Sequence, residues 1–380
     1  MDSKLPNVGT TIFAVMSQLA AECDAINLSQ GFPGFDPDPA LLDRVSHYLN
    51  SGKNQYAPMT GVPALREAIA TKVKNLYGRS VDANTEVTVS DGATEGLFSA
   101  IQATVRPGDE VIVFDPAYDS YAPAVTLAGG TTIHLPLAQG TDEFIDWQRL
   151  SDTINERTRL IILNSPHNPT GAILSASDLD ALADIVRNTG IYLLSDEVYE
   201  HIVFDNRSHQ SLLMHDELWP RSFVVFSFGK TYHATGWKVG YCVAPEALSV
   251  EFRRIHQFTC YAVITPVQHA LADYMQQTPG HYDELPKFYA AKRDHFCGLL
   301  KDSRFRFVPA RGTFFQLLDY SAITDEHDVD YAKRLTREIG VASIPVSVFC
   351  ESEPDTRYLR FCFAKDDATL EEAADRLCRL

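Results

Sequence analysis

The sequence predicts an α/β protein in which a seven-stranded, mostly parallel, doubly wound sheet is joined to a smaller α+β domain. Between residues 85 and 245, short apolar runs alternate with turns and helical patterns, which is the rhythm of an open sheet with crossover helices. The runs are almost continuously apolar, as expected for strands that helices cover on both faces. The expected strands span residues 87–89, 111–114, 131–135, 160–163, 191–194, 223–226 and 239–243.

The other elements follow in chain order. A helical pattern through Leu19 precedes a loop rich in glycine and proline. Apolar residues at helical spacing predict further helices over 40–50, 62–76, 95–105, 178–186 and 281–300. In the second lobe we expect strands at 305–308, 313–318 and 358–363, and helices at 328–339 and 368–379. The predicted organisation is an N-terminal arm that belongs partly to the small domain (1–40), a large domain (41–285) and a small C-terminal domain (286–380).

Charge and composition limit the possible partners. The formal net charge is −17, which argues against nucleic acid and anionic membrane surfaces because both require basic patches. The seven cysteines are scattered, which is typical of reduced thiols in a reducing compartment. There is neither a signal-peptide pattern nor an apolar run long enough to span a bilayer. We therefore expect a soluble, cytoplasmic protein.

Polar and aromatic residues follow the first two strands of this series. The turn at 90–96 places glycines at the start of a helix, where free backbone N–H groups and the helix dipole can hold a phosphate. A simple helix cap at Thr94 explains the same pattern. Tyr118, after the strand at 111–114, could stack on a flat ring or could be a core tyrosine.

The next strands end in groups that could carry out chemistry. Asn168 lies between two prolines after the strand at 160–163, in what is otherwise an ordinary turn. Asp196, which could also be a helix cap, and Tyr199 follow the strand at 191–194. Lys230 follows a glycine at the end of the strand at 223–226. A lone lysine there is usually a solvated loop residue, but a desolvated amine can bond covalently to an aldehyde.

Together these strand ends supply a phosphate seat, a flat ring, an amide, a carboxylate, a phenol and an amine. This set matches the needs of pyridoxal phosphate, whose aldehyde bonds an amine and whose ring nitrogen requires a buried carboxylate. No metal site is predicted.

Several longer motifs carry a family resemblance. The segments 227–230 with 235–240, 168–171 and 195–199 resemble those of the class I/II aminotransferases, which have the pyridoxal-phosphate-dependent transferase fold of type I. The segments 27–33, 54–61 and 360–365 resemble the methionine aminotransferase branch, which is related to kynurenine and glutamine aminotransferases. The resemblance extends over essentially the whole chain.

The resemblance implies a role for each cofactor-binding residue. Lys230 would bond the cofactor and move the proton, Asp196 would pair with the ring nitrogen, and Asn168 and Tyr199 would hydrogen-bond the ring oxygen. Tyr118 would stack on the ring. The phosphate would be held by the amides of Ala93 and Thr94, by Ser227 and Lys238, and by Tyr56 of a second subunit. The resemblance therefore implies a homodimer with shared active sites.

The resemblance also implies how substrates bind. Arg360 would clamp the carboxylate of an amino acid or 2-oxo acid, with Gly31 and Asn164 assisting. The expected walls of the side-chain pocket are Phe13, Phe32, Tyr56 and, from the second subunit, Tyr261. These walls favour methionine and other apolar, aromatic or glutamine-like chains over dicarboxylates. The implied reaction is a ping-pong transamination. The alternative, a carbon–sulfur β-lyase with the same cofactor, shares these motifs.

Overall fold

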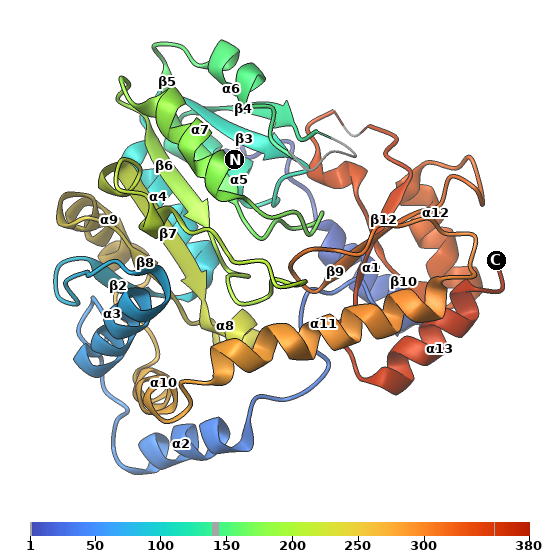
Figure 1. Cartoon of the computed structure of the whole chain (residues 1–380), viewed down its shortest axis with the longest axis horizontal. Coiled ribbons are helices and arrows are strands. Elements are labelled where there is room, and N and C mark those ends of the chain that lie inside the picture. The colour runs from blue at the N-terminus through green and yellow to red at the C-terminus, as the bar shows by residue number, and fades with distance from the viewer. Residues whose placement is uncertain (1, 139–143, 353) are drawn as a thin grey trace.

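The computed structural model describes residues 2–138, 144–352 and 354–380. Its centre is a seven-stranded sheet in the order β2-β8-β7-β6-β5-β3-β4 (Figure 1). All seven predicted strands are present, with ends shifted by one or two residues. Their bounds are β2 Val87–Ser90, β3 Glu110–Asp115, β4 Thr131–Pro136, β5 Thr158–Asn164, β6 Tyr192–Asp196, β7 Ser222–Ser227 and β8 Gly240–Val243.

Strand direction explains why the polar groups meet at one edge of this sheet. The neighbouring strands from β7 through β4 are parallel, and only β8 runs against its two neighbours. In the register, Gly240 at the start of β8 pairs with both Ser227 at the end of β7 and Ser90 at the end of β2. The carboxyl ends of β2 and β7 therefore lie at the same edge as those of the other parallel strands.

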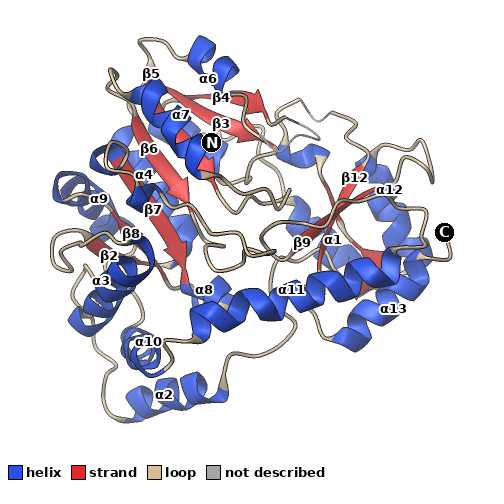
Figure 2. Cartoon of the chain, viewed as in Figure 1, coloured by secondary structure: helices blue, strands red, loops and turns tan. Residues whose placement is uncertain are grey.

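Helices cover both faces of the sheet, as the apolar strands predict (Figure 2). One face packs against α3 (Pro63–Tyr77), α7 (Ala176–Val186) and α10 (Thr265–Gln277). The other packs against α4 (Gly92–Thr104), α5 (Tyr121–Ala128) and α9 (Glu246–Thr259). Successive strand residues alternate between the two faces and both faces are covered, so the strands inside the sheet are mostly apolar, whereas the edge strand β4 is more exposed. The other helices of this part are α2 Pro39–Asn50, α6 Trp147–Thr153 and α8 Phe228–Thr231.

The second part of the molecule has its own sheet and core. Its antiparallel strands have the order β11 (Ile344–Pro345), β12 (Tyr358–Cys362), β9 (Phe315–Asp319). The N-terminal segment joins this part, because β1 (Ile26–Asn27) pairs with β10 (Val341–Ala342). The helices there are α1 Ile12–Glu22, α12 Asp328–Arg334 and α13 Asp367–Leu377, and α11 His281–Leu300 runs from the large sheet into this part (Figure 1). The residue limits of the domains remain a prediction.

One predicted strand of this part is wrong, and one predicted helix is present but changes its helix type. The strand expected at 305–308 is reduced to one bridge between Arg306 and Asp319. Val308 is 79% exposed and Pro309 follows it, and proline cannot donate to a sheet ladder. The helix expected over 328–339 is α-helical only to Arg334 and then widens into a π-helical turn over Leu335–Ile339.

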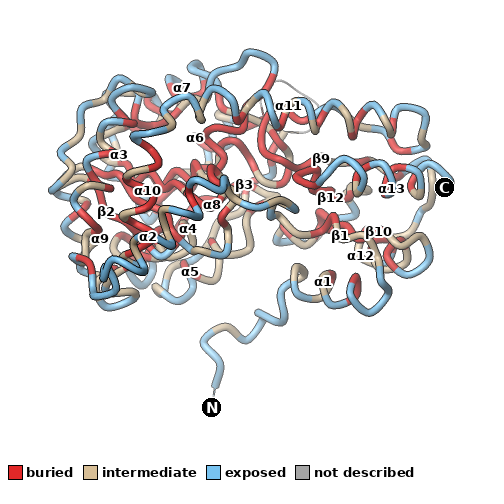
Figure 3. Tube along the Cα trace, turned by 90° about the horizontal axis from the view of Figure 1, so that it is seen from below, coloured by how far each residue is buried: buried red, intermediate tan, exposed pale blue. Residues whose placement is uncertain are grey.

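The N-terminal residues lie apart from both cores. Residues 2–9 are largely exposed and project from the body of the molecule (Figure 3). Within the described ranges, none of the helices is both long and apolar enough to cross a membrane.

Candidate active site

A cavity of about 270 Å³ lies where the carboxyl ends of the large sheet face the second part of the molecule. Most of the predicted site residues line it. They are Phe13, Gly31, Ala93, Thr94, Tyr118, Asn164, Asn168, Asp196, Tyr199, Ser227, Lys230, Lys238 and Arg360. Most of them lie at or soon after the carboxyl ends of strands of the large sheet, whereas Phe13 comes from α1 and Arg360 from β12. Side chains more than 300 positions apart in sequence are thus brought together.

The first turn of α4 forms a seat for an anion. The helix begins at Gly92, with φ +71°, and its N-cap residue Asp91 makes no side-chain capping bond. The interpretation of Thr94 as the cap is therefore wrong, and Ala93 and Thr94 present first-turn N–H groups instead. A Cβ on Gly92 would lie 3.3 Å from Lys238 Nζ, so the ammonium group is beside the helix start. A helix N-terminus and a cation converge there, which suits a phosphate.

Gly240 permits this arrangement. A Cβ at this position would lie 2.6 Å from Phe226 O and 2.9 Å from Ala93 N. No real Cβ tolerates such contacts with rigid backbone, so only glycine allows β8 to approach the start of α4 this closely.

Lys230 is a buried amine, and the interpretation of it as a solvated loop residue is wrong. Its Nζ donates a hydrogen bond to Gly31 O at 2.7 Å and lies 5.4 Å from the ring centre of Tyr199 and 5.2 Å from that of Phe314. Burial lowers the pKa of Lys230 to about 8. A substantial fraction of this amine is therefore neutral at mildly alkaline pH, as a nucleophile or base requires.

Asp196, at the end of β6, is a buried carboxylate that faces the same cavity. Its Oδ2 accepts a hydrogen bond from Tyr121 Oη at 2.7 Å, and its Oδ1 accepts one from Val198 N at 3.3 Å. Burial raises the pKa of Asp196 to about 6, and these two hydrogen bonds oppose that shift. At neutral pH the side chain is a desolvated anion, suited to a cationic partner in the cavity.

Two asparagines and an arginine form the next part of the wall. Asn164 Nδ2 donates to Asp196 O, and Asn164 Oδ1 accepts from Asn168 N, both at 2.8 Å. Asn168 Oδ1 in turn accepts from Arg360 Nη1 at 2.8 Å, and Arg360 Nη2 donates to Ser29 O at 2.9 Å. The position of Arg360 is therefore set from both sides of the cavity.

Aromatic rings enclose Arg360. Its Cζ lies 4.0 Å from the ring centre of Phe315, 5.3 Å from that of Phe13 and 5.6 Å from that of Phe349. The guanidinium is almost fully buried, and its Nε has no hydrogen-bond partner among the described residues. A desolvated guanidinium at a cavity wall is suited to bind a carboxylate.

Three predicted pocket residues do not line the cavity within this chain. Tyr56 and Tyr261 are 82% and 55% exposed, with their ring centres 5.3 Å apart. Both are predicted to act in the site of a second subunit, which a single chain does not test. Phe32 is 44% exposed, and Lys365 Nζ lies 4.5 Å from its ring centre. Phe32 does not line the cavity of the single chain, so its expected place in the pocket wall remains a prediction.

Several residues of the site were not predicted from the sequence, and three of them contribute to the argument. Tyr121 is the partner of Asp196, and Gln30 and Phe315 line the cavity. Tyr121 follows Tyr118 at helical spacing, which is a signal present in the sequence. Gln30 and Phe315 carry no such signal, because their places depend on how the two sheets face each other.

The residues of the cavity fit pyridoxal phosphate. The start of α4 with Lys238 suits its phosphate, the desolvated Asp196 carboxylate suits its ring nitrogen, and the Lys230 amine suits its aldehyde. Within the described ranges, no group of three or more histidine, cysteine or acidic side chains is arranged to hold a metal ion. Fold and site together define an enzyme that depends on pyridoxal phosphate.

Comparisons with known proteins identify the family. The model of the class I and II aminotransferases matches residues 24–377, and the chain belongs to this family. It is 52% identical over 378 residues to the methionine aminotransferase of Escherichia coli, covering all of this chain and 98% of that one. The crystal structure of that enzyme superposes with a TM-score of 0.97, covering all of this chain and 99% of the other.

More distant relatives show several specificities. A probable N-succinyldiaminopimelate aminotransferase of Mycobacterium tuberculosis is 36% identical, covering 99% of this chain and 97% of that one. The human kynurenine–oxoglutarate transaminase 3 is 32% identical, covering 98% of this chain and 88% of that one. The chain is thus an aminotransferase dependent on pyridoxal phosphate.

Proposed function

We propose that this aminotransferase takes methionine, and other apolar, aromatic or glutamine-like amino acids, as the amino donor. The observation that carries the proposal is the composition of the cavity. Its cationic lining residues in the described chain are Lys230, Lys238 and Arg360, and each has a role at the cofactor or at the α-carboxylate. No described cation of the lining is left for a second substrate carboxylate, and 52% identity to the methionine aminotransferase of Escherichia coli supports the same conclusion.

The cofactor is held by groups on both sides of its ring. The amides of Ala93 and Thr94, with Ser227 and Lys238, would hold its phosphate, and Asp196 would pair with its ring nitrogen; all of these residues line the cavity. Tyr118 would stack on the ring, and Asn168 and Tyr199 would donate hydrogen bonds to the ring oxygen. When bound, pyridoxal phosphate supplies an electron-withdrawing ring that stabilises negative charge at the substrate Cα.

The residues of the chain bind and orient the substrate and move its proton. Arg360 binds the α-carboxylate through its guanidinium group, with Gly31 and Asn164 beside it. Lys230, whose burial keeps its pKa near 8, takes the proton from the substrate Cα when its amine is neutral. Asp196 stays ionised at neutral pH and keeps the ring nitrogen protonated. Phe13 and Phe315 supply apolar walls that keep water from the reacting atoms.

We also propose a cytoplasmic homodimer whose subunits share their active sites. The exposed ring pair of Tyr56 and Tyr261, and the exposed ring of Phe258, support the dimer, because a monomer rarely leaves large aromatic side chains in water. In this arrangement Tyr56 reaches the phosphate of the neighbouring site and Tyr261 its side-chain pocket. Sedimentation analysis of the active enzyme checks the dimer, and a fully active monomer would contradict it.

The visible spectrum of the purified enzyme tests the function. Methionine should bleach the band of the lysine-bound cofactor, and a 2-oxo acid should restore it. In a panel of donors methionine should exceed aspartate by a large factor, and the reverse order would contradict the proposed specificity. Release of pyruvate and ammonia from a β-substituted amino acid without any 2-oxo acid would instead indicate the carbon–sulfur lyase. The Lys230→Ala variant should lack the visible band while keeping its far-ultraviolet circular dichroism.

A further inference from the structure

The segment at the end of β6, residues 196–200, has some side chains that line the cavity and others that are buried away from it. Asp196 and Tyr199 line the cavity, whereas the two glutamates next to them in sequence, Glu197 and Glu200, do not. Both glutamates are nevertheless buried, with 1% and 5% of their surface exposed. A buried carboxylate is costly unless it is paired and hydrogen-bonded, so each requires a dedicated set of partners. The proposed reaction uses neither of them.

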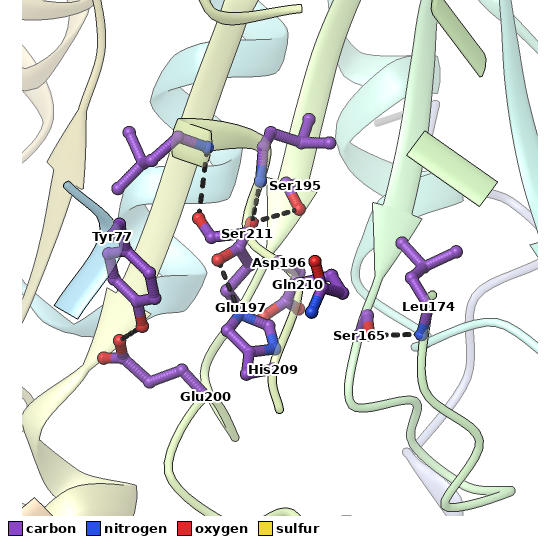
Figure 4. A network of polar contacts seen from close by, with 12 residues as sticks. Tyr77, Ser165, Leu174, Ser195, Asp196, Glu197, Glu200, His209, Gln210 and Ser211 are labelled. Carbon is purple, nitrogen blue, oxygen red and sulfur yellow. Dashed lines mark hydrogen bonds and ion pairs between the residues drawn. The ribbon is translucent and has the colours of Figure 1, made fainter. Parts of the chain in front are cut away.

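Glu197 is held by three donors behind the cavity (Figure 4). Its Oε1 accepts from Ser195 Oγ at 2.9 Å and from Leu212 N at 3.1 Å, and its Oε2 lies 2.8 Å from His209 Nε2. Its own N–H donates to Val225 O on β7 at 2.9 Å. Glu197 therefore ties the end of β6 to β7 and to the 209–212 segment.

Glu200 is held by a second, separate set of partners. Its Oε1 pairs with the ammonium group of Lys72 on α3, and its Oε2 accepts from Tyr77 Oη, which Figure 4 shows beside the Glu197 group. Lys72 Nζ also donates to Tyr241 Oη on β8 at 2.7 Å. The ion pair is buried, with only 4% and 2% of the two side chains exposed. Glu200 thus ties the turn after Tyr199 to α3 and β8.

We propose that Glu197 and Glu200 are positioning residues for the transamination reaction. Each glutamate follows a cofactor-facing residue directly in the chain, so a shift of its backbone moves Asp196 or Tyr199 with it. Two independent anchors fix both ends of the segment, which holds the carboxylate and the phenol at the spacing that the cofactor ring requires. Misplacement of a reacting group by about 1 Å can cost ~100-fold in rate, so anchoring of this kind matters for turnover. The proposal rests on the roles proposed above for Asp196 and Tyr199.

The Glu197 anchor is tested by Glu197→Ala and Glu197→Gln in the holoenzyme. The alanine variant should lower kcat by ~10- to 100-fold, while KM for the amino acid stays nearly constant because Arg360 is untouched. The dissociation constant of pyridoxal phosphate, measured by reconstitution of the apoenzyme, should rise by about 10-fold. Glutamine keeps an acceptor oxygen for Leu212 N and Ser195 Oγ, and should restore most of both losses.

A matched control separates positioning from general destabilisation. Asp178 is also a buried carboxylate with three donors, Ser175 N, Ser175 Oγ and Trp147 Nε1, but it lies on α7 and does not line the cavity. Asp178→Ala should lower the melting temperature and leave kcat and the cofactor dissociation constant unchanged. A Glu197→Ala enzyme that behaves like this control would overturn the proposal.

A test of the Glu200 anchor requires a variant that does not leave a buried charge without a partner. Glu200→Gln alone leaves Lys72 buried and unpaired, which can unfold the protein. The double variant Lys72→Met/Glu200→Gln removes both charges, and should fold yet show reduced kcat and weaker cofactor binding. Unchanged values in the double variant would contradict a positioning role for Glu200. The Asp196→Asn variant, made in parallel, separates the role of Asp196 from that of its anchor. Normal turnover in Asp196→Asn would refute the role of Asp196 itself. Lost turnover in Asp196→Asn together with normal turnover in Glu197→Ala would refute only the positioning role of Glu197.

Discussion

Replacing Tyr121 by phenylalanine removes one hydroxyl group from the site and leaves the ring in place. That hydroxyl donates the 2.7 Å hydrogen bond to Asp196 Oδ2, and it is the strongest of the contacts that oppose the effect of burial on the pKa of Asp196. The ring itself packs edge-on against Tyr118 with 5.6 Å between ring centres, so the phenylalanine variant should keep the local packing.

The size of the effect follows from the loss of one hydrogen bond to a charged group. Such a bond contributes ~1.5–3 kcal/mol, and one pKa unit corresponds to about 1.4 kcal/mol, so the pKa of Asp196 should rise by ~1–2 units. Burial already raises that pKa to about 6. In the variant, a large part of the Asp196 side chains would therefore be protonated at neutral pH and could no longer hold a proton on the cofactor ring nitrogen.

The assay is the pH dependence of kcat/KM for the amino donor. The acidic limb of the profile should move to higher pH by ~1–2 units in Tyr121→Phe. Tyr48→Phe is the matched control, because it removes a 2.6 Å hydrogen bond from a tyrosine to Asp273 on helices that do not line the cavity. An acidic limb in Tyr121→Phe that coincides with that of the control would refute the reasoning.

The raised pKa of Asp196 also predicts how the stability of the apoenzyme depends on pH. The pKa of Asp196 in the folded protein lies above the ordinary value of 3.8, so the folded state binds this proton more tightly than the unfolded state. The contribution of Asp196 to stability is therefore most favourable at low pH and declines as the pH rises from about 4 to about 6. In Tyr121→Phe the decline should continue to higher pH, so the difference in melting temperature between variant and parent should grow with pH.

Three further substitutions test other groups of the site. Arg360→Lys should raise KM for amino acid and 2-oxo acid by ~10- to 100-fold, because an ammonium group cannot replace the several donors of a guanidinium. Steady-state kinetics measure this change, and an unchanged KM would contradict the role of Arg360 in binding the substrate carboxylate. Asp196→Ala should keep the fold, as judged by circular dichroism, yet lose most turnover, whereas near-normal rates would contradict its role at the ring nitrogen. Gly240→Ala should lower the melting temperature and weaken cofactor binding, because its Cβ would meet Phe226 O at 2.6 Å; a variant as stable as the parent would show that β8 can shift.

Local patterns are sufficient to predict the large sheet and most of the residues that line the cavity. Every strand of this sheet except the edge strand β4 is largely buried, and the residues proposed to bind the cofactor come at or soon after strand ends. Because parallel strands end at one edge of the sheet, adjacency in the chain translates directly into adjacency in space. For this reason the order of residues along the chain is enough to place Lys230, Asp196 and Asn168 in one cavity.

The patterns are less informative where tertiary contacts override local preference. The run at 305–308 has the composition of a strand but ends beside Pro309 on an exposed edge and forms only one bridge. The helical pattern at 328–339 continues past Arg334 but widens into a π-helical turn. The first difference follows from Pro309, which a composition-based prediction of the strand did not take into account.

The sequence by itself determined the order of the strands along the chain, the position of each polar group at a strand end, and the resemblance to an aminotransferase family. Only the tertiary structure decided that Tyr121 tunes the carboxylate of Asp196, that Phe315 and Phe13 enclose Arg360, and that Glu197 and Glu200 anchor the segment between β6 and the cavity. The physical reason is that the first set depends on residues next to one another in the chain. The second depends on pairs brought together by packing, and no local pattern records those pairs.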